Sequence, residues 1–261
     1  MAAFPAPLAL RSFEYWLFQY KRTWRGSAVS TVLFPVLFLA SMGLGLGTLV
    51  DSSASGGVDG QRYLVFLAPG LLAATAMQTG VAESTYPVMG AIKWIKTYHA
   101  MLATPLGVLD VLVGHLLYIA ARVLLGATVF LAVMAAFGAV DSPLGLLTLP
   151  AAVLTGMAFS APVVAYAAVV ENDAGFAMLM RFVITPLFLF GGVFYPVQQL
   201  PLLLQQLAYL TPLWHGVALS RGLALGTVSA GAALGHALYL CAWIAGGTWV
   251  AARNYQRRLA V

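Results

Sequence analysis

Residues 111–139 read VLVGHLLYIAARVLLGATVFLAVMAAFGA, and this stretch decides the class of the fold. Its one formally charged residue is Arg122, and about 18 or more apolar residues with so few charges predict a helix that spans a bilayer. The rest of the chain has the same character, because 61% of the 261 residues are hydrophobic and only 8% are charged. A soluble domain carries about 25% charged residues. We therefore expect an all-α integral membrane protein.

The apolar segments predict six transmembrane helices, with residues 1–261 forming a single membrane domain. At about 20 residues per span, the chain has room for six helices and for no sizeable soluble lobe. The predicted spans are residues 27–50, 63–82, 111–139, 144–170, 176–194 and 230–252. Three pairs of glycines have the G-x-x-x-G spacing that lets membrane helices approach closely, namely Gly43 and Gly47, Gly222 and Gly226, and Gly231 and Gly235.

The distribution of the 13 Lys and Arg residues predicts the orientation. Only Arg62 and Arg221 lie on one side of the predicted spans, and Arg122 lies within a span. The other ten gather on the opposite side: Arg11, Lys21, Arg22, Arg25, Lys93, Lys96, Arg181, Arg253, Arg257 and Arg258. Basic residues favour the cytoplasmic side, so we expect both termini in the cytoplasm. The net charge of +5 then reflects orientation, and we expect membrane lipids and no nucleic acid as partners.

The three lysines also limit the chemistry. A phosphate-binding loop needs Lys directly after a glycine-rich run, and neither Lys21 nor Lys93 nor Lys96 has that context. The chain is therefore not expected to be an enzyme by itself or to hydrolyse ATP by that route. No cofactor is expected to bind this chain, and no metal site is predicted, because Cys241 and the histidines lack ligand spacing.

Among the Asp, Glu, Lys, Arg and His residues, three lie well inside predicted spans: His115, Arg122 and His236. Arg122 is expected to snorkel to the surface, to pair with a carboxylate or to line a wet cavity. The two histidines are interpreted as satisfied residues of the bundle. An ion-coupled carrier would need more charge near the membrane midplane than this sequence has.

Residues 1–26 predict an interfacial helix at the cytoplasmic surface, because aromatic and charged residues alternate there. The alternative is an ordinary aromatic belt and positive flank that leads directly into the first span. The residues concerned are Phe13, Tyr15, Trp16, Phe18, Tyr20 and Trp24, interleaved with Arg11, Glu14, Lys21 and Arg22.

Residues 92–105 predict a short cytoplasmic helix. Ile92, Ile95, His99 and Leu102 would share one face, and Pro105 would end the helix. Exposed basic and aromatic groups on such a helix are typical of an element that docks into the groove of a soluble partner. A helix that lies on the lipid surface is the alternative.

Residues 195–226 are too apolar for a solvated loop and too interrupted by proline for a single span. We expect two short helices that re-enter the outer leaflet, with breaks at Pro201 and Pro212. A seventh, broken span would place the basic C-terminal residues outside, against the charge distribution.

Two motifs then resemble a known family. The first comprises residues 190–196 (FGGVFYP), 199–201 (QLP), 212–215 (PLWH) and Arg221, and the second comprises residues 97–102 (TYHAML) and 104–106 (TPL). Together they resemble the ABC-2 family of transporter permeases, in the group of the nodulation-factor export and daunorubicin-resistance permeases. The chain departs from that pattern at Thr211, where the family commonly has Asn, and at Ala218, where it commonly has an acid.

The resemblance implies the permease subunit of an ATP-driven exporter in the bacterial inner membrane, which moves an amphiphilic or lipid-like substrate or drug. Its implied partners are two ATP-binding subunits, which hold ATP and Mg, and a second permease, identical or homologous. Residues 1–26 would be its elbow helix and residues 92–105 its coupling helix, with coupling residues Lys93, Lys96, Tyr98, His99 and Leu102. The implied residues of an outer gate are Gly191, Gly192, Tyr195, Pro196, Pro201, Pro212, His215 and Arg221.

A second hypothesis is an integral-membrane enzyme that acts on a lipid. It would need polar residues gathered near one interface, and Glu83, His99 and Asp110 are the candidates.

Overall fold

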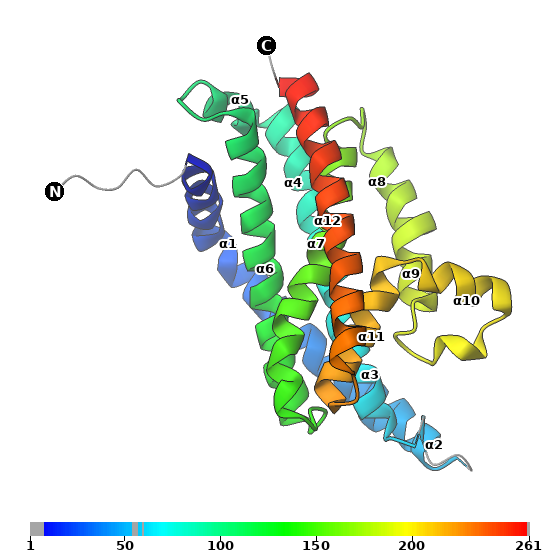
Figure 1. The fold of residues 1–261 in the computed structure, drawn as a ribbon. Helices are drawn as coiled ribbons and strands as arrows, with labels where there is room; N and C mark the ends of the chain where they lie inside the picture. Colours follow the sequence, from blue (N-terminus) through cyan, green and yellow to red (C-terminus); the bar gives the residue numbers. More distant parts are fainter. Residues whose placement is uncertain (1–7, 54–56, 59, 260–261) are drawn as a thin grey trace.

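The computed structural model describes residues 8–53, 57–58 and 60–259, and over these residues the chain folds as an all-helical bundle (Figure 1). The prediction of an all-α fold is thus confirmed. The elements in chain order are α1 Leu8–Leu39, η1 Ala40–Leu46, α2 Gly47–Asp51, α3 Tyr63–Ser84, α4 Tyr86–Met89, η2 Gly90–Trp94, α5 Thr97–Leu102, α6 Val108–Ala136, η3 Pro143–Leu147, α7 Thr148–Ala167, α8 Ala174–Leu179, η4 Met180–Ile184, α9 Thr185–Phe190, η5 Val197–Gln199, α10 Leu202–Tyr209, α11 Pro212–Leu225 and α12 Ala230–Leu259.

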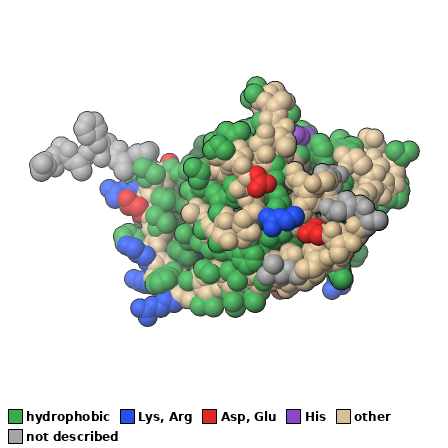
Figure 2. All heavy atoms as spheres, turned by 90° about the horizontal axis from the view of Figure 1, so that it is seen from below, with side chains coloured by type: hydrophobic (Ala, Val, Ile, Leu, Met, Phe, Trp, Pro, Cys, Tyr) green, Lys and Arg blue, Asp and Glu red, His purple; other side chains and the backbone are tan. Residues whose placement is uncertain are grey.

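The bundle has two ends, which we name after α5 and α2. The α5 end also holds the start of α1 and the C-terminal end of α12, so both ends of the described chain lie on the same side (Figure 1). Figure 2 shows the molecule from the α2 end, where hydrophobic side chains are spread over the surface, a few charged ones lie toward the middle and a group of Lys and Arg side chains lies along the left edge.

Five helices in the described part of the chain are long and apolar enough to cross a membrane: Thr31–Asp51, Tyr63–Trp94, Val108–Ala136, Pro143–Ala167 and Ala230–Leu259. The predicted fifth span corresponds to a shorter apolar helix, Ala174–Phe190. At about 1.5 Å per residue it reaches about 25 Å, less than the roughly 30 Å of hydrocarbon in a bilayer. Five of the six predicted spans therefore correspond to helices long enough to cross a membrane, and the predicted span at residues 176–194 corresponds to a shorter apolar helix.

Helix α3 forms the centre of the bundle and packs against α6, α7 and α11. Its contact with α7 depends on glycine, because a Cβ atom at Gly80 would lie 2.5 Å from the Gly156 carbonyl oxygen. Small residues let membrane helices approach to backbone contact, and both glycines serve that purpose here. The same is not true of Gly231 and Gly235, where a Cβ would meet nothing within 4 Å.

The N-terminal segment differs from the prediction of a separate interfacial helix. From Leu8, α1 runs without a break to Leu39, and its 32 residues are about 48 Å long at 1.5 Å per residue. Gly26 weakens a helix by only about 1 kcal/mol, which does not end it. Residues 1–7 of the predicted segment lie outside the described residues. The alternative interpretation, a flank that leads into the first span, fits the described helix better.

The prediction of one helix over residues 92–105 is wrong. Ile92 is buried in the π-helical turn η2, and α5 covers only Thr97–Leu102. Lys96 separates the two with φ of 58°, in the left-handed region that a residue with a side chain seldom adopts. The backbone adopts this conformation without a glycine, so the sequence held no signal for the break.

Candidate functional site

The buried side of α5 joins four helices through one tyrosine. The Tyr98 hydroxyl is hydrogen-bonded to Nδ1 of His115 on α6, and the Tyr255 hydroxyl on α12 donates to it at 3.3 Å. Trp16 on α1 completes the group, with its ring centroid 4.4 Å from that of His115. Tyr98, His115 and Tyr255 are fully buried and Trp16 nearly so. We call these four residues the Tyr98 cluster; it ties α5 to α1, α6 and α12.

The opposite side of this segment is exposed. Trp94 and Ile95 expose 60% and 73% of their surface, and Lys96 and His99 are exposed beside them. We call these four residues the α5 surface. Two large apolar side chains in a short turn between polar ones mark a surface suited to a partner or to lipid headgroups.

The structure therefore divides the five predicted coupling residues. Lys96 and His99 lie on the α5 surface, Leu102 is half-buried, and Lys93 is held in an ion pair. Tyr98 has no exposed side-chain surface, so it would act in coupling through the helices that it contacts and not by touching a partner. The helical wheel drawn over residues 92–105 failed because the chain breaks at Lys96.

Glu171, in the loop between α7 and α8, connects two further segments at the α5 end. Its carboxylate lies 3.0 Å from Nζ of Lys93 and 3.2 Å from Nη1 of Arg258, near the end of α12. The hydrogen bond from Lys93 and the charge of Arg258 lower the pKa of Glu171 below its usual value of 4.5. The ion pairs bridge the turn before α5 and the end of α12.

Toward the α2 end, Arg221 on α11 holds the motif of residues 190–196 against α3. Its Nε donates to the Phe66 carbonyl at 3.0 Å and its Nη2 to the Gly192 carbonyl at 2.9 Å. The guanidinium also stacks on the Phe66 ring, 3.8 Å from the centroid. Gly192 has φ of +80°, which explains why glycine stands at this turn.

Several predicted gate residues converge there. Gly192, Pro196 and Arg221 line one cavity of about 410 Å³, and Ala218 also borders it. Pro201 and Pro212 stand at the starts of α10 and α11, the two predicted breaks, whereas Gly191 is buried and Tyr195 half-buried.

His215 meets His236, a contact that the sequence did not indicate. Their Nδ1 atoms lie 2.8 Å apart, and Nε2 of His215 is 3.1 Å from the Tyr209 carbonyl. The Tyr239 ring stacks on His215 with centroids 3.8 Å apart. These residues link α11 to α12. The two histidines are 21 positions apart in the sequence, and this separation gave no indication that they are in contact.

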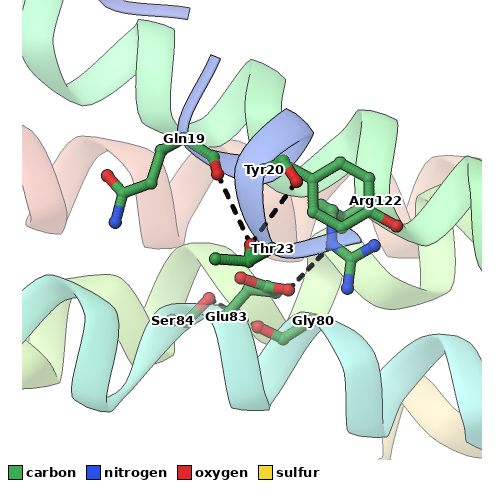
Figure 3. Close-up of polar contacts among 7 residues, drawn as sticks. All are labelled: Gln19, Tyr20, Thr23, Gly80, Glu83, Ser84 and Arg122. Carbon is green, nitrogen blue, oxygen red and sulfur yellow. Dashed lines mark hydrogen bonds and ion pairs between the residues drawn. The ribbon is translucent and has the colours of Figure 1, made fainter. Parts of the chain in front are cut away.

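Arg122 pairs with a carboxylate, one of the three outcomes expected for it. Figure 3 shows its guanidinium on α6 facing Glu83 on α3, with Tyr20 of α1 beside it. Nε of Arg122 donates to Glu83 Oε1 at 2.9 Å, and Cζ lies 4.1 Å from the centre of the Tyr20 ring. Both charged side chains are mostly buried. Together, the ion pair and the contact with the Tyr20 ring join α1, α3 and α6.

The residues of the lipid-enzyme hypothesis are not gathered. Glu83 is committed to Arg122, Asp110 accepts a hydrogen bond from the Gly107 amide at 2.9 Å, and His99 lies on the α5 surface. Within residues 8–53, 57–58 and 60–259 there is no group of three or more His, Cys, Asp or Glu placed to hold a metal.

The chain resembles known proteins over most of its length. The family model of the ABC-2 type transporter matches residues 12–225. The chain is 33% identical over 251 residues to Nodulation protein J of Rhizobium leguminosarum bv. viciae, covering 94% of this chain and 95% of the relative. It is 31% identical over 251 residues to Nodulation protein J of Sinorhizobium fredii, covering 94% of each. It is 25% identical over 200 residues to the inner membrane transport permease YadH of Escherichia coli, covering 77% and 76%.

Proposed function

Since the chain belongs to the ABC-2 type transporter family, we propose that it is the permease subunit of an ATP-driven exporter in the bacterial inner membrane. Two such permeases, identical or homologous, would work with two ATP-binding subunits that hold ATP and Mg²⁺. The α5 end, with both termini, would face the cytoplasm. The cargo would be an amphiphilic or lipid-like molecule or drug, moved by alternating access.

The observation that carries this proposal is the two-sided structure of residues 94–102. The turn that leads into α5 exposes Trp94 and Ile95, which suits insertion into a groove of a soluble subunit. The other side is fixed to α1, α6 and α12 through the Tyr98 cluster. A movement of a docked ATP-binding subunit would therefore be passed to three helices together.

The packing around Tyr98 supports a rigid transmission. Its side chain is fully buried among aromatic rings and takes part in two hydrogen bonds, so α5 has no room to rock independently of the bundle. A ligand shifts a conformational equilibrium only when it binds the two states differently. ATP-driven closure of the paired subunits would supply that difference and move the helices as rigid bodies.

At the α2 end, the Arg221 contacts support a role for α10 and α11 as the outer gate. Arg221 attaches α11 to both α3 and the turn at Gly192. Because α3 lies at the centre of the bundle, a shift of α3 would be passed through Arg221 to the residues that line the 410 Å³ cavity.

The test is co-purification of the tagged full-length chain from native membranes in mild detergent, followed by mass spectrometry and an ATPase assay. We expect a P-loop ATPase in the eluate and ATP hydrolysis by it. Ile95→Asp should remove the ATPase, because it places a charge in the centre of the α5 surface. Leu146→Asp is the matched control, since Leu146 is 71% exposed in η3, far from α5 (Figure 1).

Recovery of the chain alone, without ATPase activity, would contradict the proposal and favour an integral-membrane enzyme that acts on a lipid. Loss of the ATPase in both variants would show that the α5 surface has no special role in docking. Any second permease in the eluate distinguishes a heterodimer from a homodimer.

A further inference from the structure

A second cavity lies between α1, α3 and α6. Arg122 is the one residue of its lining that has been described above. Its volume is about 280 Å³, and the residues that line it include Thr31, Phe34, Thr75, Gln78, Thr79 and Arg122. Pro35 and Gly126 complete the lining. Five of the eight lining residues have polar or charged side chains, although all eight lie in helices long and apolar enough to cross a membrane.

The polar residues form one stripe on α3. Thr75, Gln78, Thr79 and Glu83 follow at i, i+3, i+4 and i+8, which places them on the same helix face. This helix is otherwise apolar and almost fully buried, whereas the first three residues of the stripe are only half-buried. Polar residues within membrane helices face the interior or a water-filled cavity and mark substrate pathways.

The stripe carries hydrogen-bonding capacity that the protein does not use. Neither the Gln78 amide nor the hydroxyls of Thr75 and Thr79 have a side-chain hydrogen bond to any residue that the structure describes. Only Nε of Arg122 bonds to Glu83, so its other N–H groups remain for a ligand at the cavity. Polar groups at membrane depth are costly unless they gain partners, which points to a polar occupant.

The charge and shape of the cavity restrict that occupant. Glu83 and Arg122 neutralise each other at 2.9 Å, so the site has donors and acceptors without net charge. A volume of 280 Å³ admits a headgroup but not a whole amphiphile. Phe34 lines the cavity and is 41% exposed, so the apolar remainder of a ligand would continue along the exposed face of α1, past Leu37.

We propose that this cavity binds the uncharged, hydroxyl- or amide-bearing headgroup of an amphiphile, with its tail lying against α1. Binding of such a headgroup does not depend on the exporter function. The further statement that the bound molecule is the transported cargo rests on the proposed exporter function. The same chemistry occurs in a neutral glycolipid that resides in the bilayer, and the experiment separates these two sources.

The test uses the full-length chain in nanodiscs of phosphatidylcholine and phosphatidylglycerol. The probe is a glucosyl diacylglycerol with a photoreactive diazirine in the acyl chain, and the labelled peptides are identified by mass spectrometry. A probe with the same tails and a phosphocholine headgroup is the comparison. We expect the glucosyl probe to label the lining segments of α1 and α3 about five times more strongly, as one or two net hydrogen bonds would give.

Gln78→Leu and Thr79→Val should each reduce this labelling about five-fold, and Thr79→Ser should retain it, because it keeps the hydroxyl. The matched control is Thr128→Val on α6, whose hydroxyl bonds only to the Leu124 carbonyl and whose labelling should not change. Equal labelling by both probes, or no effect of the two cavity variants, would overturn the assignment.

A second arm adds the co-purified ATP-binding subunits and ATP. Labelling by a cargo-like ligand should fall as ATP drives it from the site, whereas unchanged labelling would identify a resident bilayer lipid and overturn the cargo assignment. The first arm needs no ATPase, so failure of the binding site and failure of the proposed exporter function are distinguished.

Discussion

Aspartate substitutions at Ile95 and at Tyr98 separate the docking role of residues 94–102 from their structural role. Ile95 is 73% exposed and Tyr98 is fully buried, although they are three residues apart. Aspartate at position 95 should abolish binding of the ATP-binding subunit and leave the bundle folded. Aspartate at position 98 should destabilise the bundle strongly, whatever its effect on docking.

The expected stability losses differ widely. Tyr98→Asp removes a buried aromatic ring and leaves His115 and Tyr255 without their partner, which together cost at least about 4 kcal/mol. At about 2–4 °C per kcal/mol, the melting temperature should fall by roughly 8–16 °C. An exposed substitution such as Ile95→Asp should stay within about 0.5 kcal/mol of the unchanged chain. Tyr98→Phe removes only the hydroxyl and should cost about 1–3 kcal/mol.

The assay is thermal unfolding in detergent, followed by size-exclusion chromatography, with co-purification of the ATPase measured on the same preparations. The reasoning is refuted if Tyr98→Asp melts within about 2 °C of Ile95→Asp, since a fully buried site should be far more sensitive than an exposed one. Intact ATPase binding by Ile95→Asp would refute the docking role alone.

Three further perturbations test other contacts. Arg221→Lys should lower stability by about 2 kcal/mol in the same melting assay, because one ammonium group cannot bond both carbonyls as the planar guanidinium does, and a melt unchanged from that of the native chain would contradict the anchoring role. Gly216→Ala should cost about 1–3 kcal/mol, since its Cβ would lie 2.2 Å from Thr155 Oγ1, and adding Thr155→Ala should recover part of the loss. Because the pKa of Glu171 is lowered on folding, the contribution of its ion pairs is present above its unfolded pKa and is lost as pH falls through the folded value, below 4.5. In the native chain, amide hydrogen exchange of residues 93–103, measured relative to the intrinsic rate, should therefore be faster at low pH than at pH 7. Glu171→Gln lacks the ion pairs at every pH, so its exchange should already be fast at pH 7 and should not rise further on acidification.

The helix starts marked by proline were predictable, because local chemistry fixes them. Pro201 and Pro212 stand at the starts of α10 and α11, as expected from the missing amide hydrogen of proline. Lys96 was not predictable as a break, since a residue with a side chain seldom adopts a left-handed backbone and no glycine stands there. The continuity of α1 through Gly26 was one of two alternatives, because alternating aromatic and charged residues suit both an interfacial helix and a flank of the first span.

The candidate sites were only partly predictable, even where the right residues were named. Arg122 and His236 were recognised as unusual, but their partners, Glu83 and His215, lie 39 and 21 positions away in the chain. No pattern within either helix specifies which face turns toward which neighbour. The polar stripe from Thr75 to Glu83 follows helical spacing, so its periodicity was the one available signal for the cavity beside α1.

The sequence by itself determined that this chain is a helical membrane protein of the ABC-2 type, because the thickness of the bilayer sets the length of apolar segments and the motifs are local. Only the tertiary structure decided that Tyr98 faces inward, that Ile95 faces outward and that Glu83 meets Arg122. In a bilayer, apolar side chains face lipid as readily as they face protein, so hydrophobic periodicity does not reveal the rotation of a helix about its axis. That rotation is set by contacts between helices distant in sequence, and it decides which residues form the sites.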